Sequence, residues 1–284
     1  MTKLTTRDLI SMKRRGQKIT MITAYDYPTA LIADKTGIDV LLVGDSAAMV
    51  VLGERDTRFI TLEEMLVFSK AVSRAAERAL VVGDMPFMSY QVSAEEAVRN
   101  AGRFVKEGRV DAVKVEGGEE FSEIISRIVR SGIPVMGHIG VTPQRDVMST
   151  GYRLRGRKVD DLERLLRDAL SLERAGAFSI VLEFVTEEAA RIITERLSVP
   201  VIGVGSGLYC DGQCLVVHDL LGIYPNPPPF SKAYANLSSV MAGAIEKFRD
   251  DVISSRFPDE SRRFHMDKEE LEKVQERLKG LPEV

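Results

Sequence analysis

The chain contains no tryptophan, only two cysteines and only three histidines in 284 residues. Two cysteines cannot supply the framework of a small disulfide-rich secreted protein. Cys210 and Cys214 are separated by three residues, whereas redox and zinc pairs have a gap of two. We therefore expect two free, largely buried thiols.

An excess of charge of one sign and long hydrophobic runs are also missing. Lys and Arg number 39 against 42 Asp and Glu, for a formal net charge of -3, so no basic surface for nucleic acid is expected. No apolar stretch approaches the roughly 18 residues of a membrane span, and the first residues lack the apolar run of a signal peptide. These absences favour a cytoplasmic protein whose partners are small molecules or other copies of itself.

Eight short apolar runs rich in β-branched residues recur along the chain and are mostly separated by segments with helical periodicity. The runs cover residues 18–26, 39–45, 79–84, 111–116, 133–140, 178–183, 199–205 and 214–219. Strands that are apolar on both faces and alternate with helices form parallel sheets. Eight of them fit a closed (β/α)₈ TIM barrel better than an open sheet.

Helices are predicted between and beyond these strands. The segments between them with helical periodicity are 62–76, 94–107 after an N-cap at Ser93, 121–130, 162–174 and 187–196. An additional amphipathic N-terminal helix over 5–14 is expected to cover the bottom of the barrel, and a helix over 233–250 is expected to close the last unit. We predict one barrel domain over 1–266 and a charged helical C-terminal extension over 267–284.

Acidic residues end several predicted strands, at the face where such barrels carry their active sites. Asp45, Asp84 and Glu116 follow the second, third and fourth strands, and neighbouring strands lie about 4.8 Å apart. A single aspartate after a strand is also typical of a helix N-cap. Three converging carboxylates repel one another without a cation, and an all-oxygen set favours Mg²⁺ over zinc.

Lys114 and Glu183 are the next candidates. Lys114 stands two residues before Glu116, so both side chains point to the same face of the strand. Its ammonium either holds a substrate carboxylate or neutralises one of the acids, and the sequence does not separate these roles. Glu183 ends the sixth strand, across the barrel mouth from the three acids. That place fits a general base, with a structural ion pair as the alternative.

Three further features receive lesser roles. Ser46 is placed to donate a hydrogen bond to a substrate oxygen, and His138, at the top of the fifth strand, is assigned a supporting role in substrate binding. His218, which we place at the end of the eighth strand, is treated in the same way. The glycine-rich run 203–207 fails the test for a dinucleotide fingerprint because no long helix follows it.

Several motifs in a fixed order carry a family resemblance. They are TAYD (23–26), VGDS (43–46), GDMPFMSY (83–90), VKVEGG (113–118), GHIGVTPQ (137–144), GYRLRGR (151–157), VLE (181–183) and DGQCLVVHDLLG (211–222). Together they resemble the ketopantoate hydroxymethyltransferases, also called 3-methyl-2-oxobutanoate hydroxymethyltransferases, over about residues 3–265.

The resemblance implies a Mg²⁺-dependent TIM-barrel enzyme of pantothenate biosynthesis. Such an enzyme transfers a one-carbon unit from 5,10-methylenetetrahydrofolate to α-ketoisovalerate, giving ketopantoate, and is typically a cytoplasmic homodecamer. By position, Asp45, Asp84 and Glu116 match the family's metal ligands, and Glu183 matches its proton acceptor. Ser46 and Lys114, together with the two aspartates, match its keto-acid contacts.

The sequence departs from the family pattern after VGDS, where Ala47 and Ala48 replace Leu-Gly, and the loop over 53–61 is more charged than usual. Two other functions stay open. One is a Mg²⁺-dependent lyase on a related barrel that cleaves a C–C bond without folate, and the other is a non-catalytic metabolite-binding protein.

Overall fold

A computed structural model describes residues 2–145 and 152–279 of the chain. The chain forms two compact units, Met1–Ala235 and Asn236–Val284. The candidate site residues all belong to the first unit.

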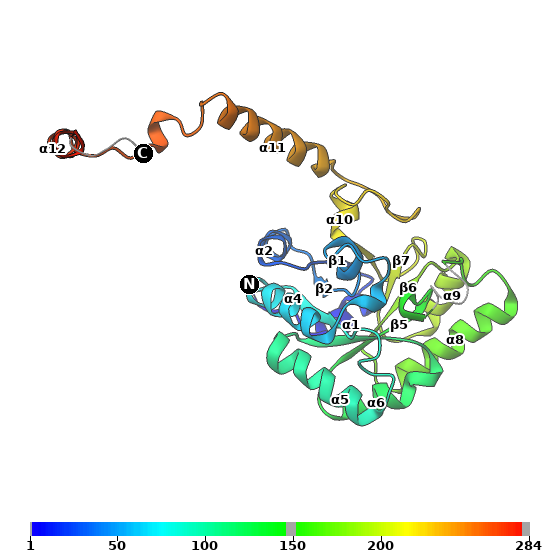
Figure 1. Cartoon of the computed structure of the whole chain (residues 1–284). Helices are drawn as coiled ribbons and strands as arrows, with labels where there is room; N and C mark the ends of the chain where they lie inside the picture. The colour runs from blue at the N-terminus through cyan, green and yellow to red at the C-terminus, as the bar shows by residue number, and fades with distance from the viewer. Residues whose placement is uncertain (1, 146–151, 280–284) are drawn as a thin grey trace. The chain divides into compact units, whose positions relative to one another are not determined.

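The first unit is a closed barrel of eight parallel strands, as the sequence predicts (Figure 1). Each strand pairs with the next, and β8 closes the ring on β1 through the pairs Ile19↔Gly212 and Met21↔Cys214. The strands are β1 (Ile19–Thr23), β2 (Val40–Val43), β3 (Leu80–Asp84), β4 (Ala112–Glu116), β5 (Val135–Gly140), β6 (Ser179–Glu183), β7 (Val201–Val204) and β8 (Gly212–Leu215).

Helices surround the strands in this unit (Figure 1). The longer ones are α2 (Tyr27–Lys35), α4 (Leu62–Ala75), α5 (Ala94–Arg103), α6 (Ser122–Arg130), α8 (Val159–Arg174) and α9 (Glu187–Arg196), and the short ones are α3 (Ala47–Val50), η1 (Thr57–Phe59), η2 (Phe104–Gly108), η3 (Glu119–Phe121) and α10 (Val217–Leu220). Ser93 caps α5 by accepting the Glu96 N–H, as predicted. Helix α2 was not predicted, although Asp26 caps it by accepting the Thr29 N–H.

Helix α1 (Thr6–Arg14) covers the bottom of the barrel. It begins with a capping box in which Thr5 and Asp8 bond to each other's backbone N–H. Its buried residues Leu9 and Met12 belong to the same cluster as the inward residues Ile19 and Met21. The predicted place of this helix is therefore confirmed.

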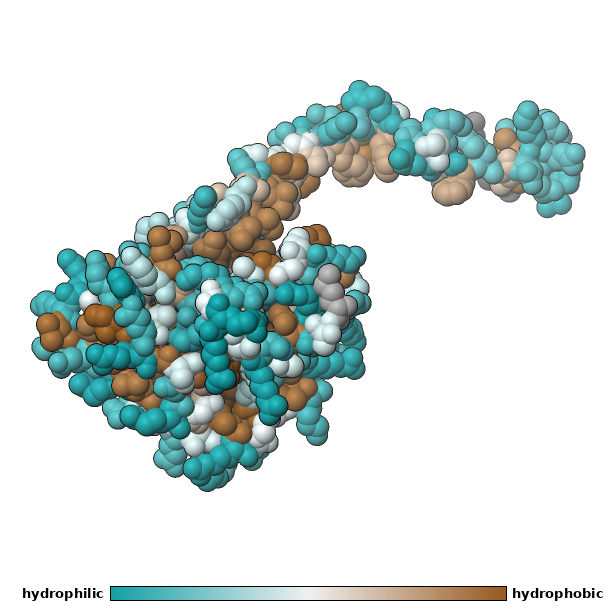
Figure 2. All heavy atoms as spheres, turned by 180° about the vertical axis from the view of Figure 1, so that it is seen from behind, coloured by the Kyte–Doolittle hydropathy of each residue, from teal (hydrophilic) through white to brown (hydrophobic). Residues whose placement is uncertain are grey.

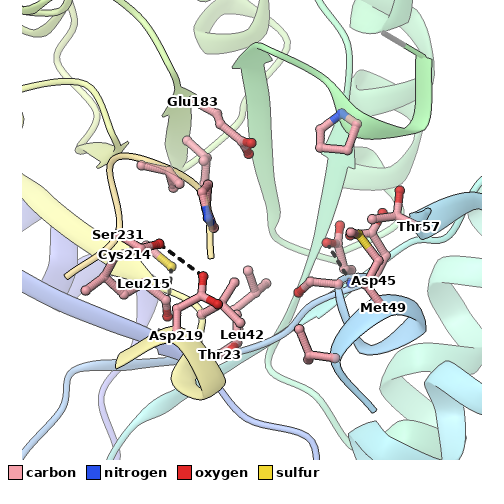
Figure 3. A pocket seen from close by; sticks show the side chains of 18 of the residues that line it. Thr23, Leu42, Asp45, Met49, Thr57, Glu183, Cys214, Leu215, Asp219 and Ser231 are labelled. Carbon is pink, nitrogen blue, oxygen red and sulfur yellow. Dashed lines mark hydrogen bonds between the residues drawn. The ribbon is translucent and has the colours of Figure 1, made fainter. Parts of the chain in front are cut away.

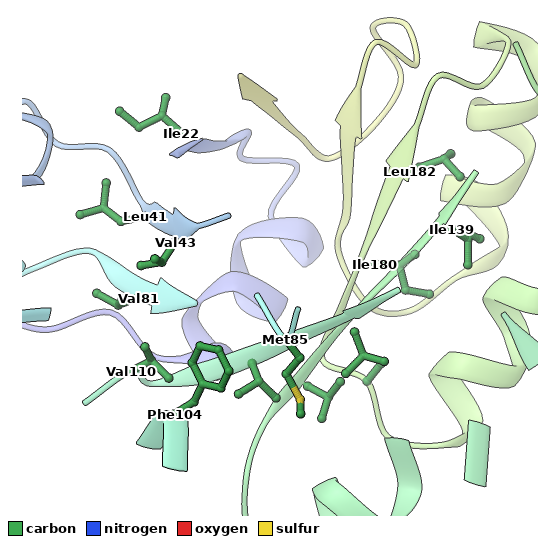
Figure 4. Packing of buried hydrophobic residues seen from close by; sticks show 14 of the residues in the cluster. Ile22, Leu41, Val43, Val81, Met85, Phe104, Val110, Ile139, Ile180 and Leu182 are labelled. Carbon is green, nitrogen blue, oxygen red and sulfur yellow. The ribbon is translucent and has the colours of Figure 1, made fainter. Parts of the chain in front are cut away.

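The hydrophobic core has two layers, because successive residues of a strand point to opposite faces. Inward residues such as Val40, Leu42 and Val82 fill the barrel interior. Outward residues such as Leu41 and Val81 pack under the helices (Figure 4). Burial on both faces explains why the strands read as nearly continuous apolar runs.

The eighth strand was placed wrongly from the sequence. It spans Gly212–Leu215 rather than 214–219, and the chain turns at Val216 into the short helix α10. The Val217 N–H donates to the Thr23 hydroxyl, at 2.9 Å, instead of continuing the sheet. His218 and Asp219 therefore lie on α10, and His218 does not end a strand.

The second unit contains α11 (Leu237–Ile253), η4 (Glu260–Arg262) and α12 (Lys268–Leu278). None of its described residues is buried. The predicted tail 267–284 contains α12, while residues 280–284 lie outside the described part. The boundary between 266 and 267, and the closure of the last barrel unit by the helix predicted at 233–250, stay predictions.

The surface of the barrel unit is mostly hydrophilic on the face shown in Figure 2, with separate small hydrophobic areas. Among residues 2–145 and 152–279, no helix has the length and apolar character needed to span a bilayer.

Candidate active site

A cavity of about 370 Å³ opens at the carboxyl ends of the strands. All seven residues predicted for the site line it: Asp45, Ser46, Asp84, Lys114, Glu116, His138 and Glu183. Asp84, Glu116 and Glu183 are the last residues of β3, β4 and β6. Figure 3 shows Asp45 and Met49 on one side of the open space, Asp219 and Ser231 on another, and Glu183 between them.

Lys114 is the centre of a buried charge cluster. Its Nζ donates to both carboxylate oxygens of Asp84, at 2.6 and 2.7 Å, and lies 3.5 Å from Oε1 of Glu116. The Asp45 N–H donates to Oδ2 of Asp84 at 3.2 Å. The ammonium thus neutralises an acid of the cluster, which was one of its two predicted roles.

The pKa values show that one ammonium does not balance three acids. Burial, together with the charges of Asp84 and Glu116, raises the pKa of Asp45 well above its usual value. Burial also raises the pKa of Asp84, against the effect of Lys114. Burial alone would raise the pKa of Glu116, yet Lys114 and His138 hold it below its usual value. Asp45 and Asp84 are therefore the acids whose charged forms the folded site disfavours.

His138 connects the acid cluster with Glu183. Its Nδ1 lies 3.2 Å from Oε1 of Glu116, and its Nε2 lies 3.3 Å from Oε2 of Glu183, without good hydrogen-bond alignment at Nε2. Burial and the charge of Lys114 oppose protonation, yet the two glutamates raise the pKa of His138 to about 9. A charged His138 ring lies between the carboxylates of Glu116 and Glu183 and attracts both, which agrees with the supporting role predicted for His138.

Gln144 fixes the acids from helical residues 143–145, which follow β5. Its Nε2 donates to Oδ2 of Asp45 and to the Met85 carbonyl, both at 3.0 Å, and its N–H donates to Glu116 at 3.2 Å. Its Oε1 accepts the Tyr90 hydroxyl at 2.8 Å. Gln144 ends the GHIGVTPQ motif, and no role for it was predicted from the sequence.

The acids fit a hard divalent cation by charge and by donor type, since oxygen atoms are the ligands that Mg²⁺ prefers. In the described part of the chain, no group of three or more His, Cys, Asp and Glu side chains is arranged to hold a metal ion as it stands. Lys114 engages Asp84 instead. Asp45 and Asp84, whose pKa values are raised, are the acids that a cation would stabilise most.

Ser46 lines the cavity beside Asp45, and its hydroxyl lies 2.8 Å from that of Tyr25. Ala47 and Ala48, which replace the Leu-Gly of the family pattern, are both buried at the start of α3. Ala48 is helical there and has a negative φ, so it needs none of the backbone freedom of glycine.

The wall formed by α10 and the segment that follows it was missed from the sequence. Asp219 is 4% exposed and lines the cavity, and its Oδ2 accepts the Ser231 hydroxyl at 3.0 Å. Its Oδ1 has no hydrogen-bond partner among the described residues. The only available signal was Asp219 itself, because the predicted strand ended there.

The cysteines and His218 lie near this wall. Both thiols are free and buried, as predicted. Burial raises the pKa of Cys214, which lines the cavity, to about 12, so this thiol is no nucleophile at neutral pH. The His218 ring packs 5.5 Å from that of Tyr25, and His218 is absent from the cavity lining.

A second cavity, of about 500 Å³, lies outside the barrel mouth and contains none of the predicted site residues. Arg145 and Arg164 line it, but each is paired with an acid, Glu120 and Asp161 respectively. The family motif over 151–157 reaches the first cavity through Tyr152. Gly151 of that motif lies outside the described residues.

Comparisons with known proteins agree with the architecture and the motifs. A family model described as "Ketopantoate hydroxymethyltransferase" matches residues 3–260. Proteins named 3-methyl-2-oxobutanoate hydroxymethyltransferase are similar over nearly the whole chain. The one from Hyperthermus butylicus is 50% identical over 273 residues, covering 96% of this chain and 94% of the relative. That from Nitrosopumilus maritimus is 52% identical over 273 residues, covering 96% and 98%.

Solved structures show the same fold at low sequence identity. A phosphonopyruvate hydrolase has a TM-score of 0.61 at 14% identity and covers 98% of this chain and 97% of its own. A phosphoenolpyruvate phosphomutase from Streptomyces platensis subsp. rosaceus has a TM-score of 0.61 at 14% identity, with coverage of 97% and 99%. At this identity the likeness shows the barrel fold alone.

Proposed function

The chain belongs to the ketopantoate hydroxymethyltransferase family, and on that premise we propose that it transfers a hydroxymethyl group from 5,10-methylenetetrahydrofolate to α-ketoisovalerate, with ketopantoate as the product. The family is one of transferases. The observation that carries the proposal is that Glu183, a carboxylate placed to act as a base, shares one cavity with the acid cluster around Lys114.

The keto acid binds against the acid cluster. The Ser46 hydroxyl donates to one of its oxygens, and the ammonium of Lys114 offsets the charge of its carboxylate. Asp45, Asp84 and Glu116 would hold Mg²⁺, which would supply Lewis-acid stabilisation for the negative charge on the keto oxygen. The support for this assignment is that burial raises the pKa values of Asp45 and Asp84, so a cation beside them would stabilise their charged forms.

Glu183 acts as the general base. Its carboxylate takes the proton from C3 of the keto acid, and the electrons of the C–H bond form the enolate. C3 then forms a bond to the one-carbon unit, water supplies the hydroxyl oxygen, and tetrahydrofolate leaves as the C–N bonds break. The Nε2 atom of His138 lies 3.3 Å from Oε2 of Glu183 and orients this carboxylate relative to the acid cluster.

The assignment is tested with ¹³C-labelled methylenetetrahydrofolate, α-ketoisovalerate and Mg²⁺. We expect the label at the new hydroxymethyl carbon of ketopantoate, and no turnover when the folate is left out. Turnover of a keto or hydroxy acid by C–C cleavage without folate would instead support a lyase. Binding of the keto acid without any turnover would support a binding protein.

The assembly and the compartment follow from the same premise. We propose a homodecamer in the cytoplasm. Sedimentation velocity should give the mass of ten 31.5 kDa chains, and the mass of a single chain in that measurement would contradict the decamer.

A further inference from the structure

Among the acids that line the cavity, Asp219 alone has a fully buried carboxylate oxygen without a hydrogen-bond partner in the described part of the chain. It is 4% exposed, and one of its oxygens, Oδ1, has no hydrogen-bond partner among the described residues. Leaving a buried carboxylate oxygen unpaired costs free energy, and such a group calls for an explanation. Asp219 lines the cavity, so its carboxylate belongs to a wall that faces a bound ligand.

The surroundings of Asp219 offer few oxygen ligands for a metal ion. Among the described residues, the Ser231 hydroxyl is the only side-chain hydrogen-bond partner of Asp219, and no second acid is paired with it. A hard cation needs six or more oxygen ligands, with several from the protein when it is held tightly. The burial of Asp219 raises its pKa, against the effects of Ser231 and His218. The missing partner is therefore a hydrogen-bond donor.

The wall next to Asp219 is lined mainly by apolar side chains. Leu215 lines the cavity from the end of β8, Val216 from the turn after it and Val204 from the end of β7. Phe230 lines it from the segment after α10. Gly205 has a φ of +64°, and a Cβ at this position would lie 2.5 Å from the Phe230 ring. The absence of a side chain at Gly205 thus lets Phe230 settle into the wall.

The Asp219 wall lies apart from the acid cluster. Figure 3 shows Asp219 and Ser231 across the open space from Asp45 and Met49. The small keto acid is held at the acid cluster under the proposed function, which leaves this wall to face the second substrate. A ring with apolar faces and hydrogen-bond donors on one edge matches this combination of apolar side chains and one carboxylate.

We propose that Asp219 binds the pterin ring of the one-carbon donor through its N–H and amino edge. This inference rests on the proposed function. The pterin edge presents a ring N–H and an exocyclic NH₂ side by side, the fork that a carboxylate accepts with two parallel hydrogen bonds. Oδ1 is unpartnered, and Oδ2 has capacity beyond the Ser231 hydroxyl. The Ser231 hydroxyl positions the carboxylate.

Titration calorimetry with 6-methyltetrahydropterin tests the binding step directly. We compare the wild type with Asp219→Asn, which keeps the shape and removes the charge, and with Ser231→Ala, which keeps the carboxylate. Asp160→Asn is the matched control. Asp160 is exposed at the start of α8, and its substitution by Asn removes the same single negative charge. We expect Kd to rise about 10- to 100-fold in Asp219→Asn, less in Ser231→Ala and not at all in the control.

Kinetics separate this inference from the proposed function. In Asp219→Asn the KM for methylenetetrahydrofolate should rise in parallel with Kd, while the KM for the keto acid and the folate-free exchange of its C3 proton stay within about twofold. Wild-type affinity for the pterin in Asp219→Asn, or no pterin binding by the wild type, would overturn the inference. So would a loss of exchange in this variant with pterin binding intact. Absence of transfer by a wild type whose pterin binding depends on Asp219 would overturn only the proposed function.

Discussion

The cavity has two acidic walls that differ in how their carboxylates are satisfied. On the wall formed by β2, β3 and β4, Lys114 bonds both oxygens of Asp84, and Gln144 bonds Asp45 and Glu116. On the α10 wall, Asp219 has one hydroxyl partner and one unpartnered oxygen. The first wall has an excess of charge held in a rigid network, whereas the second has a single open acceptor. The first wall therefore suits a cation and an anionic substrate, whereas the second wall suits a hydrogen-bond donor.

Removal of one charged side chain from the first wall should lower both the stability of the protein and its C3 proton exchange. Asp84→Asn leaves the ammonium of Lys114 buried without its main carboxylate, and breaking a buried pair costs about 3–5 kcal/mol. It also removes a proposed metal ligand, so we expect C3 proton exchange to fall at least about 1000-fold. Urea unfolding and exchange measured by NMR check both effects.

The control for this variant is again Asp160→Asn, which should unfold at the same urea concentration as the wild type. An Asp84→Asn protein that is as stable as the wild type and equally active would contradict the account of the first wall.

Gln144 should matter less than an acid, since it carries no charge. Gln144→Ala removes the side-chain donor to Asp45 and one of the two acceptors of the Tyr90 hydroxyl, which keeps the Glu116 carbonyl at 3.0 Å. We expect a loss of about 1–3 kcal/mol of stability, mainly from the Asp45 carboxylate. We expect exchange to fall roughly tenfold because Asp45 is no longer held in place. Gln91→Ala, which removes a 3.4 Å contact to the same amide, should behave like the wild type. Equal losses in both variants would show that Gln144 does not act through Asp45.

The second wall should gain stability when its charge is removed. The pKa of Asp219 is raised in the folded state by burial, so folding favours the protonated form. The resulting contribution to stability is present at low pH and is lost as pH rises through the folded pKa. At neutral pH the charged Asp219 therefore destabilises the ligand-free protein, and Asp219→Asn should raise its stability by about 0.5–2 kcal/mol.

Thermal unfolding of the ligand-free protein between pH 4 and pH 8 checks this sign. The advantage of Asp219→Asn should shrink as the pH falls. A variant that is less stable than the wild type at pH 8 would show that Asp219 has a structural partner in the folded chain.

The smallest effect concerns the thiol that lies in the cavity lining. Burial raises the pKa of Cys214 to about 12 and that of Cys210 to about 11, so thiolate is scarce at pH 8. Iodoacetamide should label the native protein slowly, as followed by mass spectrometry, and activity should persist. Rapid labelling of Cys214 with loss of activity would mean that the cavity exposes a reactive thiolate.

Much of the fold was predictable because local signals agree with the tertiary structure. Glu187–Arg196 is helical over the range that periodicity indicates, and apolar runs buried on both faces mark the strands. The eighth strand was misplaced because residues 214–219 are apolar in both the strand and the helix that follows. The turn at Val216 depends on the Thr23 hydroxyl, which is distant in sequence.

The candidate site was predictable on one wall and not on the other. Asp45, Asp84 and Glu116 follow successive parallel strands, so topology alone brings them together. Gln144 and Asp219 both come from helical residues that follow a strand, where placement depends on tertiary contacts rather than on strand periodicity. The unpartnered state of Asp219 Oδ1 has no sequence signal at all, because it depends on which groups are absent around a folded side chain.

The most direct test of the account is proton NMR of α-ketoisovalerate in D₂O with Mg²⁺ and without folate. The wild type should exchange the C3 proton, Glu183→Gln should lose at least about 100-fold of this rate, and removal of Mg²⁺ by EDTA should abolish it. Exchange that persists in Glu183→Gln, or that is absent from a wild type shown to bind Mg²⁺, would contradict the assignment of Glu183 as the base facing the acid cluster.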